Sequence, residues 1–137
     1  MPRTNVKPKK KNTRTKDLAS KKAKQVYNST DWGDLKKVIK QRDKVCTYSG
    51  YAIDHIDHII PMRLAPYLKF IPDNLQGLSI SSHSTKTELD NISFTIETWF
   101  NIVFPFHCEQ LKLSEYKSKK LKEKLLKMVE MNGIKKD

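Results

Sequence analysis

Apolar residues first recur at helical spacing soon after residue 27. The repeating positions are Trp32, Leu35, Val38 and Ile39. Their intervals are near 3.6 residues, which predicts an amphipathic helix that Ser29 or Thr30 can cap. The polar side of this helix carries Lys36, Lys37, Lys40 and Arg42.

The next part of the chain predicts a turn, extended backbone, a loop and a short helix. Residues 46–60 are typical of a turn at 48–50 followed by an extended run that ends at Pro61. Residues 62–77 contain two further prolines and predict an irregular loop. Residues 79–90 predict a short helix, because Thr85 and Glu88 have the spacing of a capping box.

Two more apolar segments follow. The run at 92–106 fits a helix through Ile92, Ile96 and Trp99, but its start also fits a strand, and periodicity alone does not decide between them. We favour a helix that Pro105 stops. Residues 114–131 predict a lysine-rich amphipathic helix with Gly133 just past its end. Its apolar stripe is Leu121, Leu125, Met128 and Val129.

The charge is concentrated at the two ends of the chain. The 137 residues carry a formal charge of +12, and residues 1–24 hold ten Lys or Arg against one acid. Such ends are typical of a protein that binds a polyanion, because Lys and Arg release counterions from phosphate. We expect residues 1–25, with Lys9, Lys10 and Lys11, to form a flexible basic tail that binds nucleic acid. No 18-residue apolar run or signal peptide is present, so we expect a soluble cytoplasmic protein without a membrane partner.

Cysteine and glycine usage excludes two classes of protein. Two cysteines, Cys46 and Cys108, are too few for a disulfide scaffold. Four glycines cannot build a glycine-rich phosphate loop of the Walker or Rossmann kind. We therefore expect no nucleotide cofactor.

Three short motifs carry candidate chemistry: Asp57-His58 before Ile-Ile-Pro, Asn74 before Leu-Gln, and His83 three residues before Lys86. In this order they resemble the HNH endonuclease family, in particular its phage-type members, over residues 27–89. The resemblance implies an α+β fold: an HNH nuclease core at 26–91, made of a lead-in helix and a ββα-metal motif, with a helical extension at 92–137 packed on it.

The residue types suit phosphodiester hydrolysis. A neutral imidazole can take a proton from water near pH 7, and a carboxylate can hold Mg²⁺ or Mn²⁺ beside a phosphate. The resemblance implies His58 as general base, Asp57 and His83 as metal ligands, and Asn74 as the residue that fixes the His58 loop. Lys86 would share a helix face with His83 and hold a flanking phosphate.

Two ambiguities bear on this assignment. Asp54-His55 repeats the Asp-His pair three residues earlier. Only Asp57-His58 has the spacing to Asn74 that the HNH family shows, so we expect His55 to be structural or exposed. In a regular strand Asp57 and His58 would also point to opposite faces, so the strand must break there. His107 matches no motif, and we expect it to be a partly buried polar side chain.

The zinc knuckles of phage-type relatives are mostly lost here. Their four cysteine positions correspond to Cys46, Ser49, Ser79 and Ser82. Serine is a poor zinc ligand compared with thiolate, so we expect no structural zinc.

The sequence therefore predicts a metal-dependent, phage-encoded DNA endonuclease that acts in the host cytoplasm. An alternative is a catalytically inactive HNH-like protein that binds nucleic acid. A third is a small interaction protein whose C-terminal apolar stripe docks on a partner helix. Phage-type relatives often serve DNA packaging beside terminase, and others act as homing enzymes. Nothing in the chain chooses between these roles.

Overall fold

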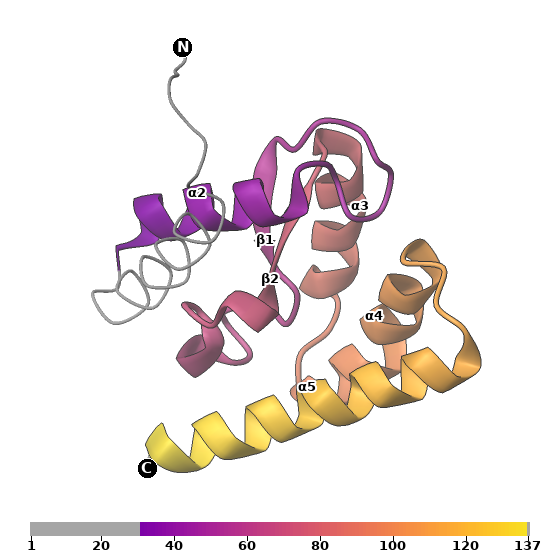
Figure 1. Cartoon of the computed structure of the whole chain (residues 1–137). Coiled ribbons are helices and arrows are strands. Elements are labelled where there is room, and N and C mark those ends of the chain that lie inside the picture. The colour runs from indigo at the N-terminus through magenta and orange to yellow at the C-terminus, as the bar shows by residue number, and fades with distance from the viewer. Residues whose placement is uncertain (1–30, 137) are drawn as a thin grey trace.

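The computed structural model describes residues 31–136, and the predicted basic tail with Lys9, Lys10 and Lys11 lies outside this range. The elements in chain order are α2 (Trp32–Asp43), β1 (His55–His58), short 3-10 turns at Pro66–Leu68 and Pro72–Asn74, β2 (Leu75–Leu78), α3 (Ile80–Asn91), α4 (Ile96–Gln110) and α5 (Glu115–Lys136). Within this range the chain is α+β, as predicted. Its four α-helices surround one two-stranded antiparallel sheet (Figure 1).

The two strands form the centre of the site-bearing region. β1 pairs antiparallel with β2 in a register that sets Asp57 opposite Gln76 and His58 opposite Leu75. Figure 1 shows α2 and α3 on either side of this pair. The prediction of a loop over 62–77 is therefore wrong for its last residues, which belong to β2. The run Leu-Gln-Gly-Leu has no strand pattern of its own, and pairing with β1 makes it a strand.

Close packing explains the glycine in β2. A Cβ placed on Gly77 would lie 2.5 Å from the Ile53 side chain. Its backbone N–H donates to the Asp43 carboxylate at 2.8 Å, and its carbonyl accepts from the Thr47 N–H at 3.0 Å. Gly77 thus lets the turn before β1 and the end of α2 approach the sheet.

α2 and α3 form where the sequence predicts them, but with other caps. Asp31 caps α2 by accepting from the Asp34 N–H at 3.1 Å. Ser79 caps α3 by accepting from the Ser82 N–H at 3.4 Å, while Thr85 lies inside the helix. The buried face of α2 consists of Leu35 and Ile39, which pack with Leu75 of β2.

The apolar run after α3 forms a helix, but Pro105 does not stop it. α4 continues through Pro105 to Gln110. Because proline has no N–H, the Asn101 carbonyl loses the hydrogen bond that residue 105 would otherwise donate. Asn101 and Pro105 both lie on the exposed side of α4. Solvent can satisfy that carbonyl, while Trp99, Val103 and Phe104 stay buried on the other side.

α5 closes the main hydrophobic core from below in Figure 1. Leu125 of α5 and Trp99 of α4 are buried in one cluster with Ile60 and Leu68 from the loop after β1. α5 also runs beyond its predicted end, because Gly133 packs beside the Tyr67 ring and stays helical. None of the helices in the described part of the chain is long and apolar enough to cross a membrane.

Candidate active site

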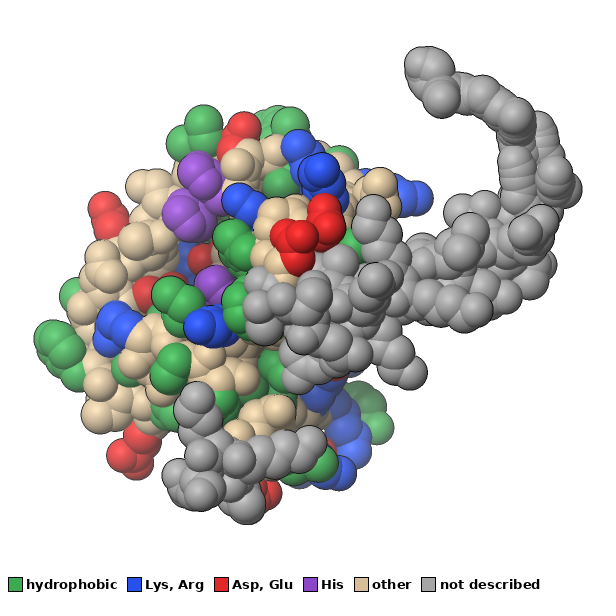
Figure 2. All heavy atoms as spheres, turned by 90° about the vertical axis from the view of Figure 1, so that its left-hand side faces the viewer, with side chains coloured by type: hydrophobic (Ala, Val, Ile, Leu, Met, Phe, Trp, Pro, Cys, Tyr) green, Lys and Arg blue, Asp and Glu red, His purple; other side chains and the backbone are tan. Residues whose placement is uncertain are grey.

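Three of the predicted site residues line one cavity. Asp57, His58 and His83 border an open cavity of about 230 Å³ between the end of β1 and α3, together with Arg63 and Thr87. Figure 2 faces this side of the molecule and shows histidine side chains at the surface, with charged side chains recessed between them. The fold thus brings together residues that are 26 positions apart in the sequence.

Asp57 and His58 are the last two residues of β1, and their side chains point to opposite faces of the sheet. Asp57 faces α3, whereas the His58 ring stacks on Trp32 of α2 with a centroid distance of 5.3 Å. β1 includes both residues, paired in register with Gln76 and Leu75, so the expected break between them is not found. Although their side chains point to opposite faces of the sheet, both residues line the cavity, because it lies at the end of the strand.

Asn74 holds the backbone that follows His58. Its side chain is fully buried and makes two hydrogen bonds to Ile60: Oδ1 accepts from the N–H at 2.9 Å, and Nδ2 donates to the carbonyl at 3.1 Å. The Asn74 carbonyl also accepts from the Ile59 N–H at 2.8 Å. The chain after His58 is thus tied to the start of β2 on both sides.

The His58 ring is oriented by its neighbours. Nε2 lies 3.0 Å from the Lys69 carbonyl, which can only accept, so Nε2 carries the ring proton. Nδ1 is then the unprotonated nitrogen of the neutral ring. Burial lowers the pKa of His58, although the Lys69 carbonyl and Asp57 oppose this effect. The ring is therefore neutral near pH 7 and can accept a proton at Nδ1.

The two oxygens of Asp57 have different surroundings. Oδ2 accepts from Lys86 Nζ at 3.0 Å and from Gln76 Nε2 at 3.1 Å. Oδ1 lies 3.9 Å from Nε2 of His83, whose pKa burial lowers against the opposing effect of Asp57. The carboxylate is held through one oxygen, and its other oxygen faces a neutral imidazole.

Lys86 does not reach solvent, contrary to the prediction that it holds a flanking phosphate. Its side chain is fully buried, and Nζ donates to the His58 carbonyl at 2.9 Å, to Asp57 at 3.0 Å and to Asp90 at 2.7 Å. An ammonium group has three N–H donors, and all three are used. Lys86 shares a side of α3 with His83, but that side is buried at Lys86.

Asp90 connects this cluster to α4. Its Oδ1 accepts from Trp99 Nε1 at 3.0 Å, and Arg63 donates to its backbone carbonyl. Burial raises the pKa of Asp90, and Lys86 opposes that rise.

Arg42, which the sequence predicts to bind DNA, also makes structural contacts at the end of α2. Its Nε and Nη2 donate to both oxygens of Asp43, at 2.7 and 3.0 Å. Two further N–H groups, on Nη1 and Nη2, donate to the carbonyls of Pro72 at 3.0 Å and Leu75 at 2.7 Å. Arg42 thus joins the end of α2 to the start of β2. The other predicted α2 cations, Lys36, Lys37 and Lys40, are exposed.

Sequence reasoning missed a buried polar chain behind Asp57. Gln76 Nε2 lies 3.2 Å from the Tyr48 hydroxyl, which lies 2.6 Å from Nδ1 of His107. Burial lowers the pKa of His107 to about 3 and raises that of Tyr48, so the neutral hydroxyl donates to the imidazole. His107 is fully buried rather than partly buried. The one available signal was the Gln two residues after Asn74, and its contact with Asp57 depends on strand register.

His55 lies beside the site rather than in its cavity. Its ring stacks on the His83 ring with centroids 4.4 Å apart, and its side chain is exposed. This placement agrees with the expectation of an exposed histidine.

Cys46, Ser49, Ser79 and Ser82, the four positions compared with zinc-knuckle cysteines, meet in space. The Ser49 N–H donates to Cys46 Sγ at 3.3 Å, and the Ser49 and Ser79 hydroxyl oxygens are 3.3 Å apart. Burial raises the pKa of the Cys46 thiol, but hydrogen bonds from Ser49 and Ser82 outweigh it and lower that pKa to about 6. Serine hydrogen bonds thus join the turn before β1 to the start of α3.

This arrangement predicts that the site can be converted to bind zinc. The Ser49→Cys/Ser79→Cys/Ser82→Cys variant should bind one zinc per chain, because with Cys46 it supplies four thiolates. At a hundredfold excess of free zinc over Kd, binding should stabilise the fold by about 2–3 kcal/mol. Zinc titration and a thermal melt measure both effects, with the wild-type chain as control. Zinc binding no tighter than in the wild type would contradict the inference that the four positions form one site.

Comparisons of the chain with protein-family models, with curated proteins and with solved structures find no significant match. The function is therefore argued from the chemistry of the site. Among residues 31–136, no group of three or more His, Cys, Asp and Glu side chains is arranged to hold a metal ion. Asp57 and His83 form a pair of potential metal ligands instead.

Proposed function

We propose that this protein is a metal-dependent endonuclease that hydrolyses phosphodiester bonds of DNA. One observation carries the proposal: a neutral imidazole with a free Nδ1, on His58, borders the same cavity as the Asp57–His83 pair. The first group suits proton abstraction from water, and the second suits a divalent cation.

His58 would act as the general base. Nδ1 takes a proton from a water molecule as the water oxygen attacks phosphorus, and the P–O bond on the opposite side breaks. The Lys69 carbonyl and the Trp32 ring keep Nδ1 directed while the ring gains its positive charge. Asn74 contributes by fixing the backbone at Ile59 and Ile60, so that the ring stays in place.

The donors present fit Mg²⁺ or Mn²⁺. Asp57 Oδ1 and His83 Nε2 are the two atoms that would hold the ion. Mg²⁺ usually keeps several waters and uses one or two protein carboxylates, so a two-residue site in an open cavity is sufficient. With both carboxylates ionised, Asp57, Asp90 and Lys86 together carry a net charge of −1, which attracts a cation. When bound, the ion would neutralise charge on the phosphate and leaving oxygen.

One observation favours the alternative of an inactive nucleic-acid-binding protein. Lys86 already places a cation 3.0 Å from Asp57, on the oxygen that faces away from His83. If this ammonium group satisfies the carboxylate completely, no metal is required, and the chain binds DNA without cutting it.

Chelation separates the two functions. EDTA should stop plasmid cleavage while leaving the thermal melt nearly unchanged, because the described core is held by apolar packing and internal ion pairs. Added Mg²⁺ or Mn²⁺ should restore cleavage. The measurements are a supercoiled-plasmid assay and a circular-dichroism melt, each with and without EDTA. DNA binding without cleavage under Mg²⁺, Mn²⁺ or Ni²⁺ would favour the alternative.

A further inference from the structure

A second, larger cavity lies beside the candidate active site. It has a volume of about 500 Å³ and runs between the outer side of α2 and the chain segment 53–56 that leads into β1. Gly33, Lys36, Lys37 and Lys40 form its helical wall. We call it the α2–β1 groove.

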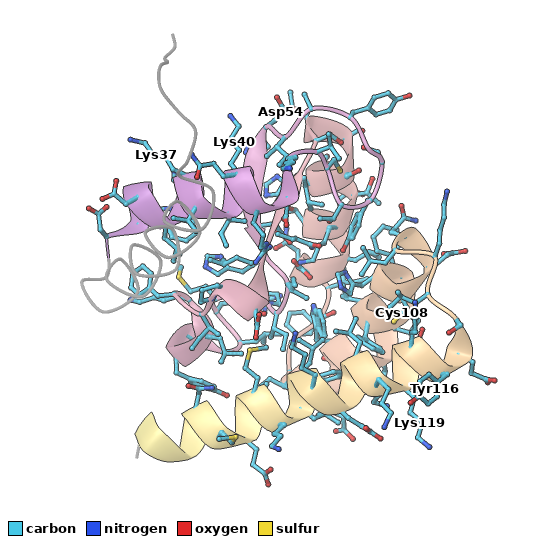
Figure 3. The ribbon with its side chains drawn as sticks, viewed as in Figure 1. Lys37, Lys40, Asp54, Cys108, Tyr116 and Lys119 are labelled. Carbon is cyan, nitrogen blue, oxygen red and sulfur yellow. The ribbon has the colours of Figure 1, made fainter. Side chains whose placement is uncertain are left out.

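The α2–β1 groove has a positive wall. Its three lysines are exposed, and none lies within ion-pair distance of a carboxylate in the described part of the chain. On α5, by contrast, Lys120 and Lys124 pair with acids. Figure 3 shows Lys37 and Lys40 projecting from α2 at the end of the molecule where Asp54 lies.

Asp54 does not cancel this charge fully. Among residues 31–136 it is the one acid that lines the groove, and its Oδ2 accepts from the Ile80 N–H at the start of α3, at 3.0 Å. Three ammonium groups against one carboxylate leave the groove with a net charge of +2.

The α2–β1 groove adjoins the candidate active site. Ile56 borders both cavities, and Trp32, which lines the groove, stacks on His58. Exposed lysines on a helix are usually only solvated, but these line a groove whose Trp32 wall contacts the candidate general base. A polyanion lying along them would extend to the site of hydrolysis.

The dimensions fit one strand of nucleic acid. A helix rises 1.5 Å per residue, so Lys36 and Lys40 are separated by about 6 Å along α2. Successive phosphates of one strand advance about 3.4 Å along a duplex axis. The three lysines can therefore reach about two or three consecutive phosphates. The volume is that of a small-ligand pocket, so the backbone of one strand enters and a whole duplex does not.

We propose that the α2–β1 groove binds the sugar–phosphate backbone of the cut DNA strand, directly beside the scissile phosphate. The location of the scissile phosphate rests on the proposed endonuclease function. The binding of DNA in the groove stands on the charge and shape of the groove itself.

Salt-dependent binding tests the lysines. In the full-length His58→Ala chain without divalent metal, the Lys36→Gln/Lys37→Gln/Lys40→Gln variant should flatten the log–log salt slope for duplex DNA by about 2–3. The control is Lys119→Gln/Lys122→Gln/Lys127→Gln on α5, which removes the same charge from exposed positions without ion pairs in the described range. Its slope should change by less than about 1. Equal changes in the two variants would overturn the proposal.

Crosslinking tests the location without removing charge. Gly33→Cys places a thiol in the groove, where a Cβ meets nothing closer than 3.6 Å, and the native Cys46 and Cys108 are buried. A thiol-linked benzophenone at this position should crosslink to a radiolabelled DNA duplex at least tenfold more than one at Tyr116→Cys, an exposed position on α5. Equal crosslinking yields at the two positions would refute the binding of DNA in the groove. If Gly33→Cys crosslinks but the wild type never cleaves, the groove is supported and the endonuclease function is refuted.

Discussion

The His58→Ala variant is expected to lose cleavage by about 100-fold or more, because a positioned general base contributes about 10²–10⁴-fold to rate. The lost group is the Nδ1 nitrogen that the Nε2 contact with the Lys69 carbonyl leaves free. DNA affinity should change little, since the base acts in the transition state. Single-turnover cleavage of a plasmid, with DNA affinity measured in parallel, separates the two effects.

His55→Ala is the matched control. It removes an exposed imidazole three residues earlier, which stacks on His83 and borders the α2–β1 groove but does not line the active-site cavity. This variant should keep most of its activity. If His55→Ala is inactive and His58→Ala cuts near the wild-type rate, the Asp54-His55 pair carries the chemistry and the assignment of the site is wrong.

The Lys86→Met variant is expected to lose about 3–5 kcal/mol of unfolding free energy, the usual cost of breaking a buried ion pair by removing one partner. Lys86 is fully buried between the carboxylates of Asp57 and Asp90, so its removal leaves two acids without their cation. It also leaves the His58 carbonyl without a side-chain donor. Urea denaturation followed by circular dichroism measures the loss.

Two comparisons make this result specific to the buried cluster. Lys120→Met breaks an exposed pair with Glu123 at 3.8 Å and should cost less than about 1 kcal/mol. Adding Asp90→Asn to Lys86→Met should recover part of the loss, because it removes one uncompensated charge while keeping an acceptor for Trp99. A Lys86→Met cost as small as that of Lys120→Met would show that the buried pairs do not stabilise the fold.

The sequence by itself determined the helices and the identities of the candidate catalytic groups. The apolar spacing from Trp32 to Ile39 is a local property, and α2 forms there. The same holds for α5, whose periodicity is visible without any partner. α3 also forms where the sequence predicts a helix, but that prediction rests on hydroxyl and capping-box positions rather than on apolar periodicity. The resemblance of three short motifs to the HNH family points to Asp57, His58 and His83, and these residues line one cavity.

The tertiary structure alone decided which polar groups face water. Lys86 looks like a solvent-exposed cation in the sequence, but oxygens of His58, Asp57 and Asp90 enclose it in the fold. Arg42 stays exposed, but the carbonyls of Pro72 and Leu75 hold it against the start of β2. Pro105 stays within a helix because its side of α4 faces solvent. The contact from Gln76 to Asp57 exists only in the observed strand register. Periodicity describes spacing along one segment, whereas burial and hydrogen-bond partners depend on segments distant in the chain, so only packing could assign these roles.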